Sequence, residues 1–197
     1  MNLYKSQHAH NNHSYNKEYY EHYLRSKGYR YEIFGVFFDM LAYVLRNAIN
    51  PKTVLDIGCA KGFLVYSFKK IGIRTYGIDI SSYAILNALP QVKDNLSLLD
   101  IEKDRLPFSD NYFDLITCIE VVEHLHNYDN MLKEIQRVLK PDGYLFITTP
   151  KIINLSAWDD PTHVNIKPKN YWISLFKKNY LFLDDKVKNK FRRTMLI

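Results

Sequence analysis

The chain has 197 residues, a formal net charge of +6, and a hydrophobic content of 47%. This length suits one domain of ordinary size and excludes two full ones, and the apolar content excludes an intrinsically disordered chain. No apolar run approaches the roughly 18 residues of a membrane span, and the polar N-terminal stretch does not resemble a secretory signal. The only cysteines are Cys59 and Cys118, so we expect no disulfide framework and a cytoplasmic protein.

Two polar regions flank the apolar part of the chain. Residues 1–14 hold three histidines and no apolar anchor, so we expect a mobile tail rather than a metal-binding tract. Basic residues gather near the C-terminus, at Lys186, Lys188, Lys190, Arg192 and Arg193. Such an excess can attract RNA or another polyanion, but a solvated surface explains it more simply.

A helical extension is expected at residues 15–50. Apolar side chains recur there at three- and four-residue spacing, at Ile33, Phe37, Met40, Leu41, Val44, Leu45 and Ile49. Pro51 should end this helix, because the residue before a proline is pushed out of the helical region. Tyr15, Tyr19 and Tyr20 precede it and are candidates for a lid over a ligand, or for simple packing.

After Pro51, short apolar runs alternate with amphipathic segments. We expect strands at 53–57, 75–80, 96–100, 113–119 and 144–149, and helices at 63–70, 83–89 and 131–139. Ser81 and Asp129 are candidate N-caps, and Pro141 to Gly143 should mark the end of the third helix. This alternation predicts an α/β, Rossmann-like, mostly parallel sheet with helices on both faces. Beyond it we expect a helix at 170–177 and weak strands at 180–183 and 193–197.

The turn after the first expected strand, from Asp56 to Gly62 (DIGCAKG), carries the strongest signal. Ligands bind outside the carboxyl ends of strands in such sheets, and Gly58 and Gly62 permit a tight turn and close backbone approach. The Asp56 carboxylate would repel a pyrophosphate but attract a cofactor that carries an ammonium and a sulfonium. The loop lacks the third glycine of a dinucleotide fingerprint, which together with Asp56 disfavours an oxidoreductase, and Gly62-Phe63 excludes a phosphate-binding Gly-Lys-Ser/Thr loop.

Acidic residues also follow the second and third expected strands. Asp79 is placed to accept hydrogen bonds from both hydroxyls of a ribose. Asp100 is placed to meet the exocyclic amine of adenine while Ile101 packs on the ring. Any one of these acids can be a helix cap or a surface charge. Three acids at successive strand ends, together with the glycine loop, favour a nucleoside-containing ligand.

Five segments carry this pattern in order: VLDIGCAKGFL at 54–64, YGIDIS at 76–81, LPFSD at 106–110, FDLITCIEVVEHL at 113–125 and VLKPDGYLFITTP at 138–150. Together they resemble class I S-adenosylmethionine-dependent methyltransferases, over about residues 15 to 180. The resemblance implies one domain at 15–197, made of a helical lid or extension (15–50), a cofactor-binding core (51–150) and an acceptor-side segment (151–197). It implies cofactor contacts at Asp56, Gly58, Cys59, Ala60, Gly62, Asp79, Ile80, Asp100, Ile101 and Glu120. Ala60 stands where many members have glycine, which should narrow the loop slightly and still permit binding.

Methyl transfer from a sulfonium is an in-line displacement, and a hydroxyl nucleophile must also lose a proton. Residues after the fourth and fifth strands flank the methyl group in this fold, which makes His124 and His163 the catalytic candidates. His163 is the preferred general base because histidine titrates near neutral pH, although a loop histidine bonded to backbone is an equally good interpretation.

Glu120, Glu123 and His124 have i, i+3, i+4 spacing, and with His163 they could form a mixed carboxylate–imidazole site for a divalent cation. The pattern resembles the metal motif of small-RNA 2′-O-methyltransferases and of ubiquinone-pathway O-methyltransferases. Bound metal would orient an acceptor hydroxyl and lower its pKa. Many methyltransferases carry the same stretch without metal, so S-adenosylmethionine is the expected cofactor and a metal is not favoured.

The expected reaction is O-methylation of a small-molecule or glycan hydroxyl. Residues 158–165 resemble sugar- and glycan-modifying members, and Trp158 and Trp172 could line an acceptor pocket or fill the core. The stretch EVVE at 120–123 stands where base-modifying enzymes often carry an Asn/Asp-Pro-Pro-aromatic motif, which disfavours methylation of DNA bases. An RNA methyltransferase and a non-catalytic adenosylmethionine-binding module are the alternatives, and the sequence leaves the oligomeric state open.

Overall fold

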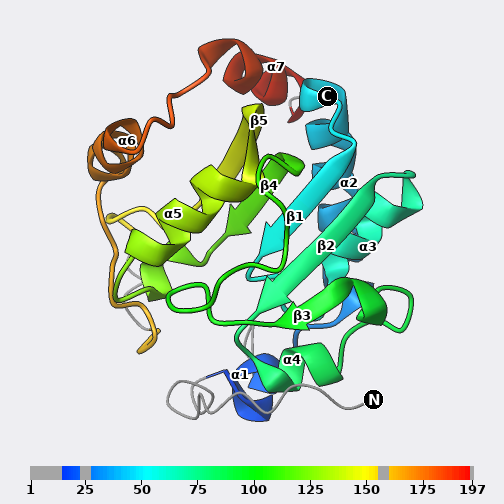
Figure 1. Ribbon diagram of the computed structural model, residues 1–197. Coiled ribbons are helices and arrows are strands. Elements are labelled where there is room, and N and C mark those ends of the chain that lie inside the picture. Colours follow the sequence, from blue (N-terminus) through cyan, green and yellow to red (C-terminus); the bar gives the residue numbers. More distant parts are fainter. Residues whose placement is uncertain (1–14, 23–27, 155–159, 196–197) are drawn as a thin grey trace.

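The computed structural model describes residues 15–22, 28–154 and 160–195, so the expected tail and Trp158 lie outside the described residues (Figure 1). The strands are β1 Thr53–Ile57, β2 Arg74–Asp79, β3 Leu96–Leu98, β4 Phe113–Ile119 and β5 Leu139–Thr148. The helices are α1 Lys17–His22, α2 Tyr31–Ile49, α3 Phe63–Lys70, α4 Ser82–Leu86, α5 Asp129–Val138, α6 Lys169–Lys178 and α7 Asp185–Met195. The strands pair in parallel in the order β3-β2-β1-β4-β5, which confirms the predicted Rossmann-like α/β fold.

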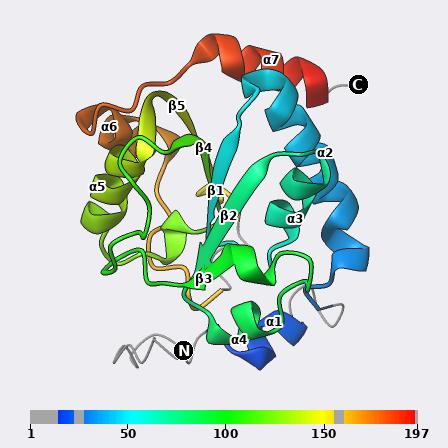
Figure 2. The ribbon, with the colours of Figure 1, turned by 45° about the vertical axis from the view of Figure 1, so that its right-hand side comes forward.

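Helices cover both faces of the sheet, with α2 and α3 on one side and α5 on the other (Figure 2). Successive residues of a strand point to opposite faces, so β1 and β4 contribute to two hydrophobic cores. Val54 and Leu115 pack with Leu45 of α2, whereas Ile57 packs with Ile135 of α5. Burial on both faces explains why these strands are continuous apolar runs in the sequence.

The expected N-terminal helix is divided into α1 and α2. The chain leaves α2 at Asn50, which adopts a left-handed conformation (φ 56°) and donates its N–H to the Arg46 carbonyl at 2.7 Å, as the proline signal predicted. The buried face of α2 includes Phe38, Leu41 and Leu45, whereas Phe37 is 51% exposed. The apolar spacing therefore identified the helix correctly. The apolar residues of α2, however, occupy more of its surface than the side that faces the core.

Most of the central elements follow the prediction, with local exceptions. The Ser81 hydroxyl caps α4 by accepting from the Ala84 N–H at 3.1 Å, as predicted, although α4 ends three residues early. The predicted Asp129 N-cap is wrong, because Asp129 is the first residue of α5 and its own N–H is held by the Asn127 side chain. The Pro141 to Gly143 segment lies inside β5, at a register irregularity, rather than at a helix end.

The C-terminal strand predictions are wrong. Residues 181–184 have no regular structure, and the expected strand at 193–197 is replaced over residues 193–195 by the end of α7. The Asp184 side chain accepts from the N–H groups of Lys186 and Val187 at 2.9 Å, which starts a helix in a sequence rich in helix-forming residues. The helix expected at residues 170–177 is confirmed as α6. Across the described ranges, no helix combines the length and apolar character that a membrane crossing requires.

Candidate functional site

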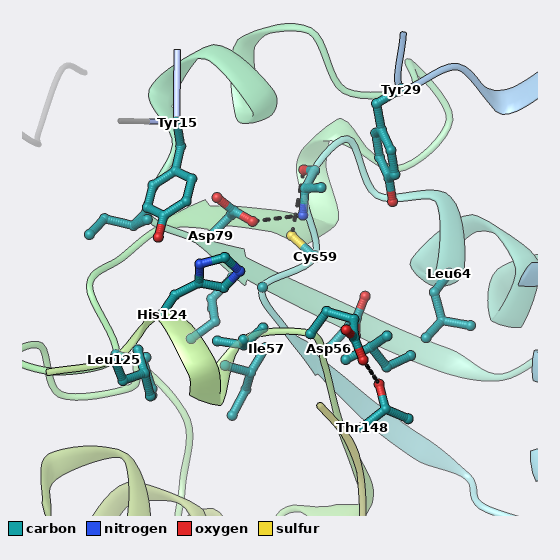
Figure 3. Close-up of a pocket in the computed structure, with 18 of the residues that line it drawn as sticks. Tyr15, Tyr29, Asp56, Ile57, Cys59, Leu64, Asp79, His124, Leu125 and Thr148 are labelled. Carbon is teal, nitrogen blue, oxygen red and sulfur yellow. Dashed lines mark hydrogen bonds between the residues drawn. The ribbon is translucent and has the colours of Figure 1, made fainter. Parts of the chain in front are cut away.

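A cleft of about 960 Å³ opens at the carboxyl edge of the sheet, where β1, β2 and β4 end (Figure 3). Every expected cofactor contact except Gly62 lines it, namely Asp56, Gly58, Cys59, Ala60, Asp79, Ile80, Asp100, Ile101 and Glu120. Both catalytic candidates, His124 and His163, line the same cleft. The tertiary structure thus brings together residues spread over more than 100 positions of the sequence.

The loop after β1 contains three left-handed residues, and two of them, Gly58 and Ala60, line the cleft. Gly58 has φ 75°, and a Cβ there would lie 2.3 Å from Val121 Cγ2, so both conformation and space require glycine. Its N–H donates to the Ile78 carbonyl at 2.9 Å, which ties the loop to β2. Ala60 also has a positive φ, 48°, and donates its N–H to Asp79 Oδ2 at 2.7 Å. The loop therefore presents its backbone to the cleft in a fixed conformation.

Gly62 supports the loop from beneath. It has φ 78° and precedes α3, and a Cβ there would lie 2.9 Å from side-chain atoms of both Leu96 and Val92. Its N–H donates to the Cys59 carbonyl at 2.8 Å. Glycine is required here for the turn into α3, and direct contact of Gly62 with a cofactor stays a prediction.

Asp56 is a buried carboxyl group next to this loop. Only 5% of the residue is exposed, and its Oδ1 accepts a hydrogen bond from the Thr117 hydroxyl at 2.6 Å. Burial raises the pKa of Asp56 to about 7, against the lowering effect of this hydrogen bond. A group of positive charge in the cleft would stabilise the ionised form, so the site favours a cationic ligand.

The carboxylates of Asp79 and Asp100 are both held in place. Asp79 accepts backbone N–H groups of Ala60 and Ser81, each at 2.7 Å, and burial raises its pKa to about 6 despite them. Asp100 accepts the Glu102 N–H at 3.0 Å and pairs with the Lys103 ammonium at 2.8 Å. Each carboxylate oxygen keeps a second lone pair, so both groups can still accept from a ligand.

Glu120 stands at the end of β4 in a left-handed conformation, with φ 52°. Its N–H donates to the Thr148 carbonyl at 3.1 Å, and its Oε1 accepts from the Thr148 hydroxyl at 2.8 Å. A non-glycine residue in this region is strained, and such strain gathers at functional sites. The bond to Thr148 links the ends of β4 and β5 across the floor of the cleft.

His124 and His163 lie against each other, with ring centroids 4.6 Å apart. His124 Nδ1 lies 2.9 Å from Thr162 Oγ1 and 3.2 Å from the Thr162 carbonyl oxygen. Burial, together with the neighbouring His163, lowers the pKa of His124 to about 4, so this ring is neutral at pH 7. The backbone N–H of His163 donates to the Asp160 carbonyl at 3.1 Å, and the ring Nε2 of His163 lies 3.8 Å from Asp160 Oδ2.

A buried carboxyl group adjoins these imidazoles. Glu123, His124 and His163 each offer a ligand atom, all within 4.8 Å of one another. Glu123 is fully buried, and neither of its oxygens has a hydrogen-bond partner of ordinary geometry, although Glu120 and Thr149 are near enough to influence it. Burial, with a smaller contribution from the charge of Glu120, raises the pKa of Glu123 to about 8. This donor set fits a divalent cation, with Glu120 outside the group.

Aromatic side chains from outside the sheet complete the cleft. The predicted lid residues Tyr15, Tyr19 and Tyr20 line it, and the Ser81 hydroxyl donates to the Tyr15 carbonyl at 2.6 Å. A second group of lining residues comes from α2, namely Phe34, Phe37, Phe38 and Leu41. The sequence analysis did not predict this group, because the apolar spacing indicated only core packing. Trp172 does not line the cleft and instead packs in the core against Tyr128, with ring centroids 5.4 Å apart.

Comparison with known proteins identifies relatives. Residues 55–147 match the family described as a methyltransferase domain. The chain is 35% identical over 119 residues to a ubiquinone biosynthesis O-methyltransferase of Glaesserella parasuis, covering 55% of this chain and 50% of that protein. It is 28% identical over 138 residues to the protein of the same name in Albidiferax ferrireducens, covering 68% and 49%. The chain thus spans about half the length of these curated relatives.

Solved structures share the fold. The YcgJ protein of Bacillus subtilis aligns with a TM-score of 0.61 at 22% identity, covering 79% of this chain and 77% of that one. A SAM-dependent methyltransferase from Archaeoglobus fulgidus aligns with a TM-score of 0.59 at 23% identity, covering 77% and 73%. At these identities the likeness shows the same arrangement of strands and helices.

Proposed function

Because the chain belongs to the class I S-adenosylmethionine-dependent methyltransferases, we propose that its cleft binds S-adenosylmethionine and that its methyl group passes to a hydroxyl of a small-molecule acceptor. One observation carries this proposal: the buried Asp56 carboxyl beside the Gly58 loop, in one cleft with Asp79 and Asp100. These three acids match, in strand order, the ammonium, the ribose and the adenine amine of the cofactor.

In the proposed complex each group has a separate role. Asp56 faces the cationic methionine part, and the backbone of the loop around Gly58 and Ala60 approaches it closely. The free lone pairs of Asp79 accept the ribose hydroxyls. Asp100 accepts the adenine amine, and Ile101, which is 6% exposed, packs on the ring. Cys59, Ile80 and Glu120 line the same cleft.

The apolar part of the cleft lining suits an acceptor with an apolar body. Phe34, Phe37, Phe38, Leu41 and Phe146 belong to it. Such a wall favours a flat or apolar small molecule over a glycan or RNA, which need polar or basic surfaces. The names of the curated relatives support the same class, so a precursor of ubiquinone is the first acceptor to test.

The chemistry requires one proton acceptor. As the acceptor oxygen forms its bond to the methyl carbon, the carbon–sulfur bond breaks and adenosylhomocysteine leaves; the hydroxyl proton passes to an imidazole. His163 and His124 are both candidates, because their rings lie against each other in the cleft. His163 is tested first. If a divalent cation is bound, Glu123, His124 and His163 would hold it, and it would lower the pKa of the acceptor hydroxyl.

The test is transfer of labelled methyl from S-adenosylmethionine into a fractionated cell extract, with and without chelator. We expect label in small molecules; loss of label with chelator would support the cation site. Label in RNA would support the alternative suggested by the basic C-terminal residues. Cofactor binding with no label in any fraction would support a non-catalytic module. A rise in Tm with NADH but not with adenosylhomocysteine would overturn the cofactor assignment.

A further inference from the structure

We infer that Asp160 and Thr162 form a hydrogen-bonded relay that holds the His124 ring as the tautomer protonated at Nδ1, so that Nε2 keeps its lone pair. Thr162 does not line the cleft, and no motif in the sequence pointed to it. Its purpose in catalysis rests on the proposed function, but the tautomer itself follows from hydrogen bonding alone. In a neutral imidazole one nitrogen donates and the other accepts, and the partner of one nitrogen decides which.

The relay begins at Asp160. Its Oδ1 accepts the Thr162 N–H at 2.8 Å and the Thr162 hydroxyl at 2.6 Å. The hydroxyl has a single proton, and a bond of this length to a carboxylate occupies it. Thr162 Oγ1 is therefore an acceptor toward its other neighbours. The group 2.9 Å away is His124 Nδ1, which must then be the donor.

A second contact leads independently to the same assignment. His124 Nδ1 also lies 3.2 Å from the Thr162 carbonyl oxygen, which can only accept. With the opposite tautomer, the Nδ1 lone pair would face this carbonyl lone pair, and Asp160 Oδ1 would lose its hydroxyl donor. An unmade hydrogen bond at a partly buried carboxylate is unfavourable. Both contacts therefore select the ring protonated at Nδ1.

The relay also bears on the rest of the site. The Tyr15 side chain hydrogen bonds to Thr162 as well, so the lid residue and the histidine share one anchor. The backbone carbonyl of Asp160 accepts a hydrogen bond from the backbone N–H of the neighbouring His163 at 3.1 Å. Nε2 of His124 thus becomes the atom that can accept a proton or ligate a cation, and Thr162 and Asp160 act as positioning residues.

Nuclear magnetic resonance of the cofactor-free, ¹⁵N-labelled protein tests the tautomer directly. Two-bond ¹H–¹⁵N correlations distinguish protonated from unprotonated ring nitrogens, and the His124 signals are those missing from a His124→Gln spectrum. We expect a protonated Nδ1 and an unprotonated Nε2. A ring protonated at Nε2 would overturn the inference. This measurement needs no acceptor, so failure to find methyl transfer would count against the proposed function only.

Kinetics test the positioning role once an acceptor is known. Thr162→Val should lower kcat about 10- to 100-fold, as loss of a supporting partner of a functional histidine does, and leave the KM for S-adenosylmethionine unchanged. Thr162→Ser keeps the hydroxyl and should restore most of kcat. Thr75→Val is the matched control, because Thr75 is a buried threonine on β2 whose hydroxyl has no hydrogen-bond partner. An unchanged kcat in Thr162→Val would refute the role.

Discussion

Asp56 should make cofactor binding depend on pH near neutrality. Its pKa in the cofactor-free protein is about 7 because the group is buried. Only the ionised Asp56 carboxylate attracts the cationic methionine part of S-adenosylmethionine. The affinity for the cofactor should therefore fall in proportion to the ionised fraction of Asp56. With this pKa the ionised fraction is about three quarters at pH 7.5 and about one tenth at pH 6. The Kd for S-adenosylmethionine should therefore rise about eightfold between these values.

Isothermal titration calorimetry at pH 6, 6.5, 7 and 7.5 measures this dependence, with a correction at pH 7.5 for the ligand's own amino group, which begins to titrate there. Binding at pH 6.5 should release a proton to the buffer. Asp56→Asn should bind more weakly at pH 7.5 and lose most of the pH dependence, while Asp142→Asn, at an exposed position of β5, should behave as the wild type. A pH-independent Kd in the wild type, or an undiminished dependence in Asp56→Asn, would refute the reasoning.

The same carboxyl should lower the stability of the cofactor-free protein. Its pKa is raised from 3.8 to about 7, so its contribution is most favourable below pH 4 and is lost as the pH rises through 7. The full difference corresponds to at most about 4 kcal/mol, an upper limit because buried groups relax. Asp56→Asn should thus raise the Tm at pH 7.5 while it weakens cofactor binding. A lower Tm would mean that Asp56 has a structural role instead.

Three further substitutions test separate parts of the site. Gly58→Ala should destabilise the protein by about 2–4 kcal/mol and abolish cofactor binding, measured by chemical unfolding and calorimetry, because its Cβ would overlap Val121. Ala60→Gly should stabilise the loop by about 1 kcal/mol by relieving its φ of 48°, seen as a higher Tm; a lower Tm would contradict this. His163→Gln should lower kcat about 10²- to 10⁴-fold with cofactor Kd unchanged, and a parallel loss of cofactor affinity would argue against a role as base.

Sequence patterns succeeded where short-range signals decide the structure. β4 and α3 match their predicted ranges, because a buried strand is a continuous apolar run and Gly62 and Gly72 bracket the helix. The sequence patterns failed where several weak local signals favoured different structures. The C-terminal segment was interpreted as strand from a few apolar residues, whereas Asp184 caps a helix there. The Asp129 cap failed because α5 begins at Asp129 itself, whose N–H donates to the Asn127 side chain.

The sequence alone determined which edge of the sheet carries the site. The carboxyl ends of parallel strands meet at one edge, so acids that follow successive strands, such as Asp56, Asp79 and Asp100, must gather there. The tertiary structure decided what surrounds them. Thr117 reaches Asp56 through the register of β4 on β1, and Thr162 reaches His124 across 38 positions of chain. Such contacts depend on strand register and loop path, which no local pattern of residues encodes.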